Sequence, residues 1–168
     1  MYDEIFNDIQ MQELQDILRI NKQSITTAES CTGGLISYMI TKVPNSSDIF
    51  NGAIVSYSNN IKNKQLNVKN STLEKYGAVS EEVVSQMLDG ITKKLDSNYA
   101  IAVSGIAGPG GGSINKPIGT VVIGIMGFKE EKIIDIYHFN GNREEVQIQA
   151  AKTALAKIYE FIKKTIDK

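Results

Sequence analysis

Residues 24–34, SITTAESCTGG, join a short β-prone run directly to two adjacent glycines. The run from Ser24 to about Ala28 predicts a strand, and the segment from Cys31 to Lys42 predicts a helix that Thr-Gly-Gly opens. In α/β proteins, ligands bind where a strand turns directly into a glycine-opened helix. We therefore expect an α/β fold with a ligand site at this junction.

The rest of the chain continues the alternation of helical and extended patterns. Apolar residues recur with helical spacing in three long segments, which predict helices over about residues 7–21, 81–95 and 143–164. A polar run predicts a short helix over residues 59–68. Four further strands are predicted, over residues 49–58, 99–104, 118–128 and 132–139. A hairpin turn at 127–131 joins the last two. Together these patterns predict a three-layer α/β/α single domain over residues 1–168, whose mixed sheet includes a C-terminal β-hairpin.

Composition excludes several classes of protein. The chain has 18 basic and 19 acidic residues, and its net charge of −1 lacks the cationic excess of most nucleic-acid-binding proteins. The first twenty residues are acidic and mixed with polar residues, unlike a secretory leader. Residues 120–128, the most apolar stretch, are too short to cross a bilayer. We expect a cytoplasmic protein with no nucleic-acid partner and no membrane partner.

The scarcity of histidine and cysteine narrows the chemistry further. Zinc sites, Cys-His proteases and Ser-His-Asp hydrolases would have to rely on His138 and Cys31, each the single residue of its kind. His138 lies in an alternating strand with no partner motif, and no paired carboxylates accompany the glycine-rich segments. We expect no metal site and no cofactor, and lysine remains as the available base.

Three segments at predicted strand ends carry the candidate chemistry. In AESCTGG, residues 28–34, Ser30 is either an N-cap or a nucleophile. In YSNNIK, residues 57–62, Lys62 is either a surface residue or, once desolvated, a neutral base. The loop SGIAGPGGG, residues 104–112, is either a tight turn or a set of backbone N–H groups that bind an anion or a carbonyl.

Four stretches are similar, in the same order, to one known family: TTAESCTGG (26–34), GAIVSYSNNIK (52–62), YGAVSEEVV (76–84) and SGIAGPGGGS with KPIGTV (104–121). They closely resemble the CinA C-terminal domain family, whose stand-alone members are nicotinamide-nucleotide amidases. The resemblance covers nearly the whole chain. It implies that the protein hydrolyses the carboxamide of a pyridine nucleotide, nicotinamide mononucleotide, to nicotinic acid mononucleotide and ammonia without a metal or cofactor.

The resemblance also implies a mechanism and an assembly. The family works as a Ser/Lys hydrolase through an acyl-enzyme, and its serine, its lysine and the tyrosine of its second motif map onto Ser30, Lys62 and Tyr57. The family is commonly oligomeric, so we expect a homo-oligomer. The oxyanion of the reaction is expected to lie against backbone N–H groups of the glycine-opened helix.

Substrate contacts are expected from the three segments and from Arg143, which is either a phosphate clamp or a surface residue at the start of the last predicted helix. Many relatives have Asp where this chain has Gly110, which removes any side-chain role there. The candidate substrate-binding residues are Thr32, Gly33, Gly34, Ser58, Asn59, Ser104, Gly105, Gly108, Gly110, Gly111 and Arg143.

Two other functions stay open at this point. Domains of this kind are often fused to a larger domain in CinA proteins, which leaves a non-catalytic nucleotide-binding or regulatory module as an alternative, related to competence- or DNA-damage-inducible proteins. The presence of both Ser30 and Lys62 favours an enzyme over that module. An amidase for a related pyridine nucleotide or another small amide is the third candidate.

Overall fold

A computed structural model describes residues 1–167, which form six α-helices, one short 3-10 helix and five strands. In chain order the elements are α1 (Asp8–Ile20), β1 (Ile25–Glu29), α2 (Leu35–Thr41), η1 (Ser46–Asp48), β2 (Phe50–Val55), α3 (Asn59–Leu66), α4 (Asn70–Tyr76), α5 (Glu81–Leu95), β3 (Tyr99–Gly105), β4 (Thr120–Met126), β5 (Lys132–His138) and α6 (Arg143–Ile166). No helix within residues 1–167 has both the length and the apolar composition needed to cross a bilayer.

The five strands form one mixed sheet in the order β2-β1-β3-β4-β5. β1 runs parallel to both β2 and β3, whereas β4 is antiparallel to β3 and to β5. The backbone N–H of Gly127 donates to the carbonyl of Glu131 at 2.9 Å and closes the turn between the last two strands. The structure therefore confirms the mixed sheet and its C-terminal hairpin.

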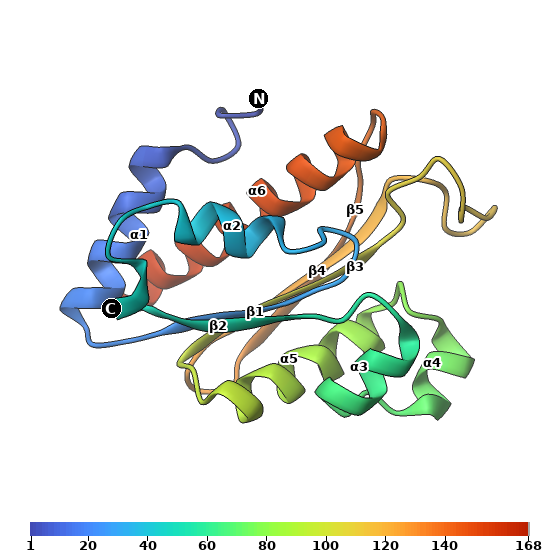
Figure 1. Cartoon of the computed structure of the whole chain (residues 1–168), viewed down its shortest axis with the longest axis horizontal. Helices are drawn as coiled ribbons and strands as arrows, with labels where there is room; N and C mark the ends of the chain where they lie inside the picture. Colours follow the sequence, from blue (N-terminus) through green and yellow to red (C-terminus); the bar gives the residue numbers. More distant parts are fainter. Residues whose placement is uncertain (168) are drawn as a thin grey trace.

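Helices cover both faces of this sheet (Figure 1). α1, α2 and α6 lie on one face, and α3, α4 and α5 lie on the other. Alternate side chains along a strand enter different cores: Ile101 and Ile123 pack in the core with α1, α2 and α6, whereas Ala102 and Val122 pack in the core with α5. This division confirms the predicted three-layer α/β/α arrangement.

The connections around β1 diverge. The chain passes from β1 to β2 through α2 on one face, and from β2 to β3 through α5 on the opposite face (Figure 1). In open α/β sheets such a divergence leaves a crevice at the carboxyl end of the strands, where ligands bind. Here that crevice lies directly after Glu29.

Three details differ from the sequence prediction. α2 begins at Leu35 and not at Cys31, because Gly33 and Gly34 have φ values of +60° and +100° and form a left-handed turn before the helix. The helix α4 was not predicted. The second and fourth strands are also shorter than predicted, spanning Phe50–Val55 and Thr120–Met126.

Candidate active site

Three parallel strands bring the candidate segments to one edge of the sheet. Ser30 directly follows β1, Tyr57 follows β2, and Ser104 lies near the end of β3. Because the carboxyl ends of parallel strands meet at the same edge, segments far apart in sequence become neighbours here. Lys62 reaches the same edge from α3, which begins immediately after β2.

The side chains of Ser30 and Lys62 contact each other in the protein interior. Lys62 Nζ lies 2.9 Å from Ser30 Oγ and donates to the carbonyl of Ser56 at 2.8 Å and to that of Tyr57 at 3.4 Å. Ser30 is 7% exposed and Lys62 1%. A neutral amine has two N–H bonds and one lone pair, so it can donate to both carbonyls and accept the Ser30 proton. The geometry suits a serine nucleophile with an amine base.

Because Lys62 is buried, a sizeable fraction of its amine is neutral near physiological pH. Desolvation by burial lowers the pKa of Lys62 from 10.5 to about 8. A pKa of about 8 leaves roughly one tenth of the amine neutral at pH 7. Burial raises the pKa of the Cys31 thiol to about 12, so this neighbour stays a neutral thiol.

Local hydrogen bonds and one close helix contact fix the position of Lys62. Ser58 is the N-cap of α3, and its side chain accepts from the backbone N–H of Ile61 at 3.2 Å. Farther along, the end of α3 packs against α5 where Gly90 faces Leu66. The helix that carries the base is therefore held at both ends.

A pocket of about 240 Å³ opens beside this pair. Cys31, Ala78, Val79, Ile106 and Ala107 line part of it. The rest of the lining consists of candidate residues named above: Ser30, Tyr57, Asn59, Lys62, Ser104, Gly105, Gly108, Gly110, Gly111 and Arg143. The lining includes two cationic side chains and no carboxylate. The pocket therefore favours an anionic ligand.

Arg143 joins two of the predicted segments at this pocket. Its guanidinium donates to the hydroxyl of Tyr57 at 2.6 Å and to the carbonyl of Gly108 at 2.7 Å. Asn142 caps α6 and places Arg143 at the first helical position. Within residues 1–167 no carboxylate lies at ion-pair distance from Arg143, whereas Arg19 pairs with two aspartates.

Four candidate residues do not line this pocket. Thr32, Gly33 and Gly34 line a neighbouring hollow of about 480 Å³, and Ser58 acts as the cap of α3. The buried carboxylate of Glu29 accepts hydrogen bonds from the first turn of α2. The N–H groups of Ile36 and Ser37 are therefore already bonded, and any oxyanion donors of the predicted glycine-opened helix belong to the turn 31–34 that precedes α2.

Several lining residues were missed from the sequence. Ala78 and Val79 lie in the stretch YGAVSEEVV, which was recognised as a motif but given no contact with the substrate. Ile106 and Ala107 lie inside the glycine-rich loop, of which only Ser104 and the glycines were predicted to contact the substrate. Cys31 directly follows the candidate nucleophile Ser30, and this position in the sequence could have indicated that it lines the pocket.

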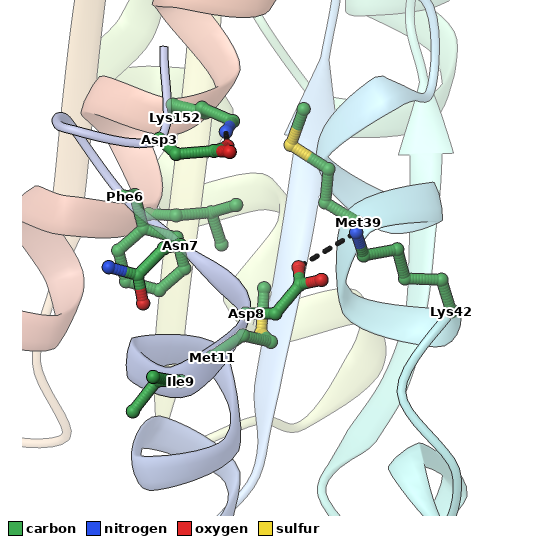
Figure 2. A pocket seen from close by; sticks show the side chains of 10 residues that line it. Asp3, Phe6, Asn7, Asp8, Ile9, Met11, Met39, Lys42 and Lys152 are labelled. Atoms are coloured by element: carbon green, nitrogen blue, oxygen red, sulfur yellow. Dashed lines mark hydrogen bonds and ion pairs between the residues drawn. The ribbon is translucent and has the colours of Figure 1, made fainter. Parts of the chain in front are cut away.

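A separate hollow of about 500 Å³ lies among residues of α1, α2, α6 and the N-terminal segment (Figure 2). Phe6 contributes to its lining, Lys42 pairs with Asp8 at 2.7 Å, and Lys152 pairs with Asp3. Its charges thus cancel in pairs, and the candidate nucleophile and base lie elsewhere.

Neither histidine nor a metal-ligand cluster contributes to the pocket. His138 lies in β5, with its Nδ1 atom 3.3 Å from Thr120 Oγ1. In the part of the chain that the structure describes, no three His, Cys, Asp or Glu side chains gather as metal ligands would.

Known proteins share both the sequence and the fold. The family model described as the CinA C-terminal domain matches residues 8–162. A CinA-like protein of Thermotoga neapolitana is 42% identical over 158 residues, which cover 94% of this chain and 38% of that protein. A CinA-like protein of Syntrophomonas wolfei is 46% identical over 151 residues, or 89% of this chain and 36% of that protein. The chain thus spans less than two fifths of the length of these relatives.

Solved structures of similar length also match. The competence damage-inducible protein A of Klebsiella pneumoniae has a TM-score of 0.87 and 33% identity, covering 90% of this chain and 94% of that one. A competence-damaged protein (CinA) superfamily protein of Escherichia coli has a TM-score of 0.87 and 32% identity, covering 94% and 90%. Sequence match and fold agree over nearly all of the chain, which belongs to the CinA C-terminal domain family.

Proposed function

We propose that this protein is an amidase that hydrolyses the carboxamide of nicotinamide mononucleotide to nicotinic acid mononucleotide and ammonia. The observation that carries the proposal is the buried contact of 2.9 Å between Lys62 Nζ and Ser30 Oγ. The substrate class comes from the family resemblance. The cationic, carboxylate-free lining of the pocket supports a phosphorylated substrate.

The proposed reaction proceeds through an acyl-enzyme. Neutral Lys62 takes the proton of Ser30 as the serine oxygen bonds to the carboxamide carbon, and the carbonyl oxygen becomes an oxyanion. Protonated Lys62 then gives its proton to the leaving nitrogen, and ammonia departs. The same amine next activates a water molecule, which breaks the ester and restores Ser30.

The oxyanion needs hydrogen-bond donors on the pocket side of Ser30. Loss of one such donor commonly raises a barrier by about 2.7–4 kcal/mol. Because the N–H groups of Ile36 and Ser37 in α2 donate to Glu29, we assign this role to other backbone N–H groups around the pocket. The glycine-rich loop contributes several lining residues there, including Gly108 and Gly110.

The decisive experiment measures ammonia release from the mononucleotide, the dinucleotide, the riboside and free nicotinamide. We expect turnover of the mononucleotide, and loss of that turnover in Ser30→Ala and in Lys62→Ala while the circular dichroism spectrum stays that of the wild type. Full activity in either variant contradicts the proposed dyad. Turnover of another amide in the panel would redirect the substrate assignment.

A regulatory or nucleotide-binding module is the competing outcome of the same panel. Such a module binds a pyridine nucleotide, as calorimetry would detect, and releases no ammonia from any member of the panel. Activity that a chelator removes and one metal restores would contradict the proposed metal-independent mechanism.

A further inference from the structure

Glu29 is a fully buried carboxylate directly before the candidate nucleophile. Its Oε1 atom accepts from Thr32 Oγ1 at 2.7 Å and from the backbone N–H of Ile36 at 2.9 Å. Its Oε2 atom accepts from the backbone N–H of Ser37 at 3.0 Å, from the Ser37 hydroxyl and from Thr27 Oγ1 at 3.3 Å. Both oxygens thus accept hydrogen bonds from groups on either side of the nucleophile.

The backbone of Glu29 is connected to the base as well. Its carbonyl accepts from the backbone N–H of Ser56 at 2.7 Å, and the carbonyl of Ser56 accepts from Lys62 Nζ at 2.8 Å. Lys62 Nζ in turn contacts Ser30 Oγ. These bonds close a ring in which one residue is linked to both members of the dyad.

We propose that Glu29 is a positioning residue that holds the Ser30–Lys62 pair in its reactive geometry, an inference that rests on the proposed amidase function. The carboxylate ties the turn 31–34 to the first turn of α2, so that Ser30 Oγ stays beside Lys62 Nζ. None of the hydrogen bonds of the carboxylate goes to the amine or to a residue that lines the pocket, so Glu29 acts through the backbone of its neighbours.

Glutamine is the informative replacement because it keeps the size of the side chain. Its amide nitrogen is a donor, and at this position it faces N–H and O–H groups that also donate. Glu29→Gln thus loses acceptors without leaving a cavity. Misplacement of a reacting group by about 1 Å commonly costs on the order of 100-fold in rate.

Two further variants lie outside the pocket, and only the first of them removes a hydrogen bond to Glu29. Ser37→Ala removes one donor to Glu29 at a half-buried position of α2. Thr41→Ala is the matched control, because Thr41 is a hydroxyl residue of the same helix whose Oγ1 donates to the carbonyl of Ser37 at 2.9 Å and not to Glu29.

The experiment follows phosphonylation of Ser30 by an organophosphorus fluoride, in which a serine oxygen–phosphorus bond forms and fluoride leaves. In parallel, kcat and KM are measured for ammonia release from the mononucleotide. We expect labelling and kcat to fall about tenfold or more in Glu29→Gln, with KM within about twofold. Ser37→Ala should show a smaller fall in both rates, and Thr41→Ala should match the wild type.

A purely structural role for Glu29 would lower the melting temperature and leave the rates per folded molecule unchanged, and that result overturns the proposal. If Glu29→Gln does not fold, equal labelling rates in Ser37→Ala and Thr41→Ala overturn it. A wild type that is labelled at Ser30 but releases no ammonia from the mononucleotide or from the other amides of the panel refutes the amidase function, and the labelling rates still decide the role of Glu29. A wild type that is not labelled at Ser30 refutes both.

Discussion

Lys62 is buried and has three oxygen neighbours, and these surroundings decide whether its amine is protonated. Two carbonyls take its N–H groups and the Ser30 hydroxyl takes the remaining position. No carboxylate faces the amine among the pocket-lining residues, so no ion pair there offsets the cost of burying its positive charge. Lysine becomes a base here through desolvation.

The rate of the reaction should therefore rise with pH. The pKa of Lys62 is lowered to about 8, and the neutral amine is the active form. We expect kcat/KM for ammonia release to increase roughly tenfold from pH 7 toward a plateau above pH 9, with a midpoint near 8. Initial rates measured between pH 6.5 and 9.5 check this. A profile that is flat or falls over that range is incompatible with a neutral lysine base.

Arg143 should discriminate between phosphorylated and unphosphorylated substrates. Its guanidinium is held by Tyr57 and Gly108 without a carboxylate partner in the described residues. We expect Arg143→Met to lower kcat/KM for the mononucleotide by about 10- to 100-fold, because a hydrogen bond to a charged group is worth about 1.5–3 kcal/mol. Any activity on the riboside should change much less.

Arg19→Met is the matched control for that comparison, since Arg19 pairs with Asp16 and Asp48 away from the pocket. This control should keep the activity of the wild type on both substrates. Equal losses on the mononucleotide and the riboside in Arg143→Met would assign Arg143 to the support of Tyr57 and the loop, with no part in phosphate recognition.

Sequence patterns located the helices that carry strong capping signals. α5 begins after Ser80, whose side chain accepts from the N–H of Val83, and α6 begins after Asn142, which forms a capping box with Glu145. α4 lacks such signals, because its N-cap Lys69 makes no side-chain cap bond. Packing against α5 stabilises α4, and a short sequence window does not contain that contact.

The sequence predicted those parts of the candidate site that depend on the types of the residues. It did not predict those parts that depend on local backbone geometry. Ser30 and Lys62 follow strands that the sequence pattern located, so their proximity follows from the fold. The left-handed turn at Gly33 and Gly34 delays the start of α2. In α2, the backbone N–H groups of Ile36 and Ser37 donate to the side chain of Glu29. The spacing of the glycines alone does not predict these hydrogen bonds.

The helices α3 and α5 contact each other where Gly90 faces Leu66. A Cβ atom at Gly90 would lie 2.0 Å from the carbonyl oxygen of Leu66, so the two helices approach through their backbones. Alanine in a helix normally stabilises it by about 1 kcal/mol relative to glycine. Here the clash should dominate, and Gly90→Ala should displace α3 and with it Lys62.

We expect Gly90→Ala to lower both the melting temperature and kcat. Lys93→Ala, an exposed change on the same helix, should alter neither. Thermal melts and ammonia release on the two variants check this. A Gly90→Ala protein that is more stable than the wild type and equally active would contradict the close approach of the two helices.

The whole molecule adds what no single element contains, namely which strands are neighbours. β1 lies in the sheet between β2 and β3, although β2 follows it in the chain and β3 comes much later. The alternation of helices and strands predicted a mixed sheet, but strand order depends on long-range pairing. It is this order that places Ser30 in the crevice between diverging connections.

The same fold makes the stability of the protein depend on the charge of Lys62. Its pKa is about 8 in the folded chain and has the ordinary value of 10.5 when unfolded. Between these values the unfolded chain holds a proton that the folded chain lacks, so this lysine makes the free energy of unfolding rise with pH. Below pH 8 the buried charge destabilises the folded state by its full amount.

Comparison with Lys62→Met isolates this effect from the other titrating groups. We expect the wild type to gain roughly 2–3 kcal/mol in unfolding free energy relative to Lys62→Met between pH 7 and pH 10. Denaturant titrations of both proteins at the two pH values measure the difference. A difference that stays constant with pH would mean that Lys62 keeps an ordinary pKa in the folded protein, and it would remove the neutral base on which the proposed chemistry depends.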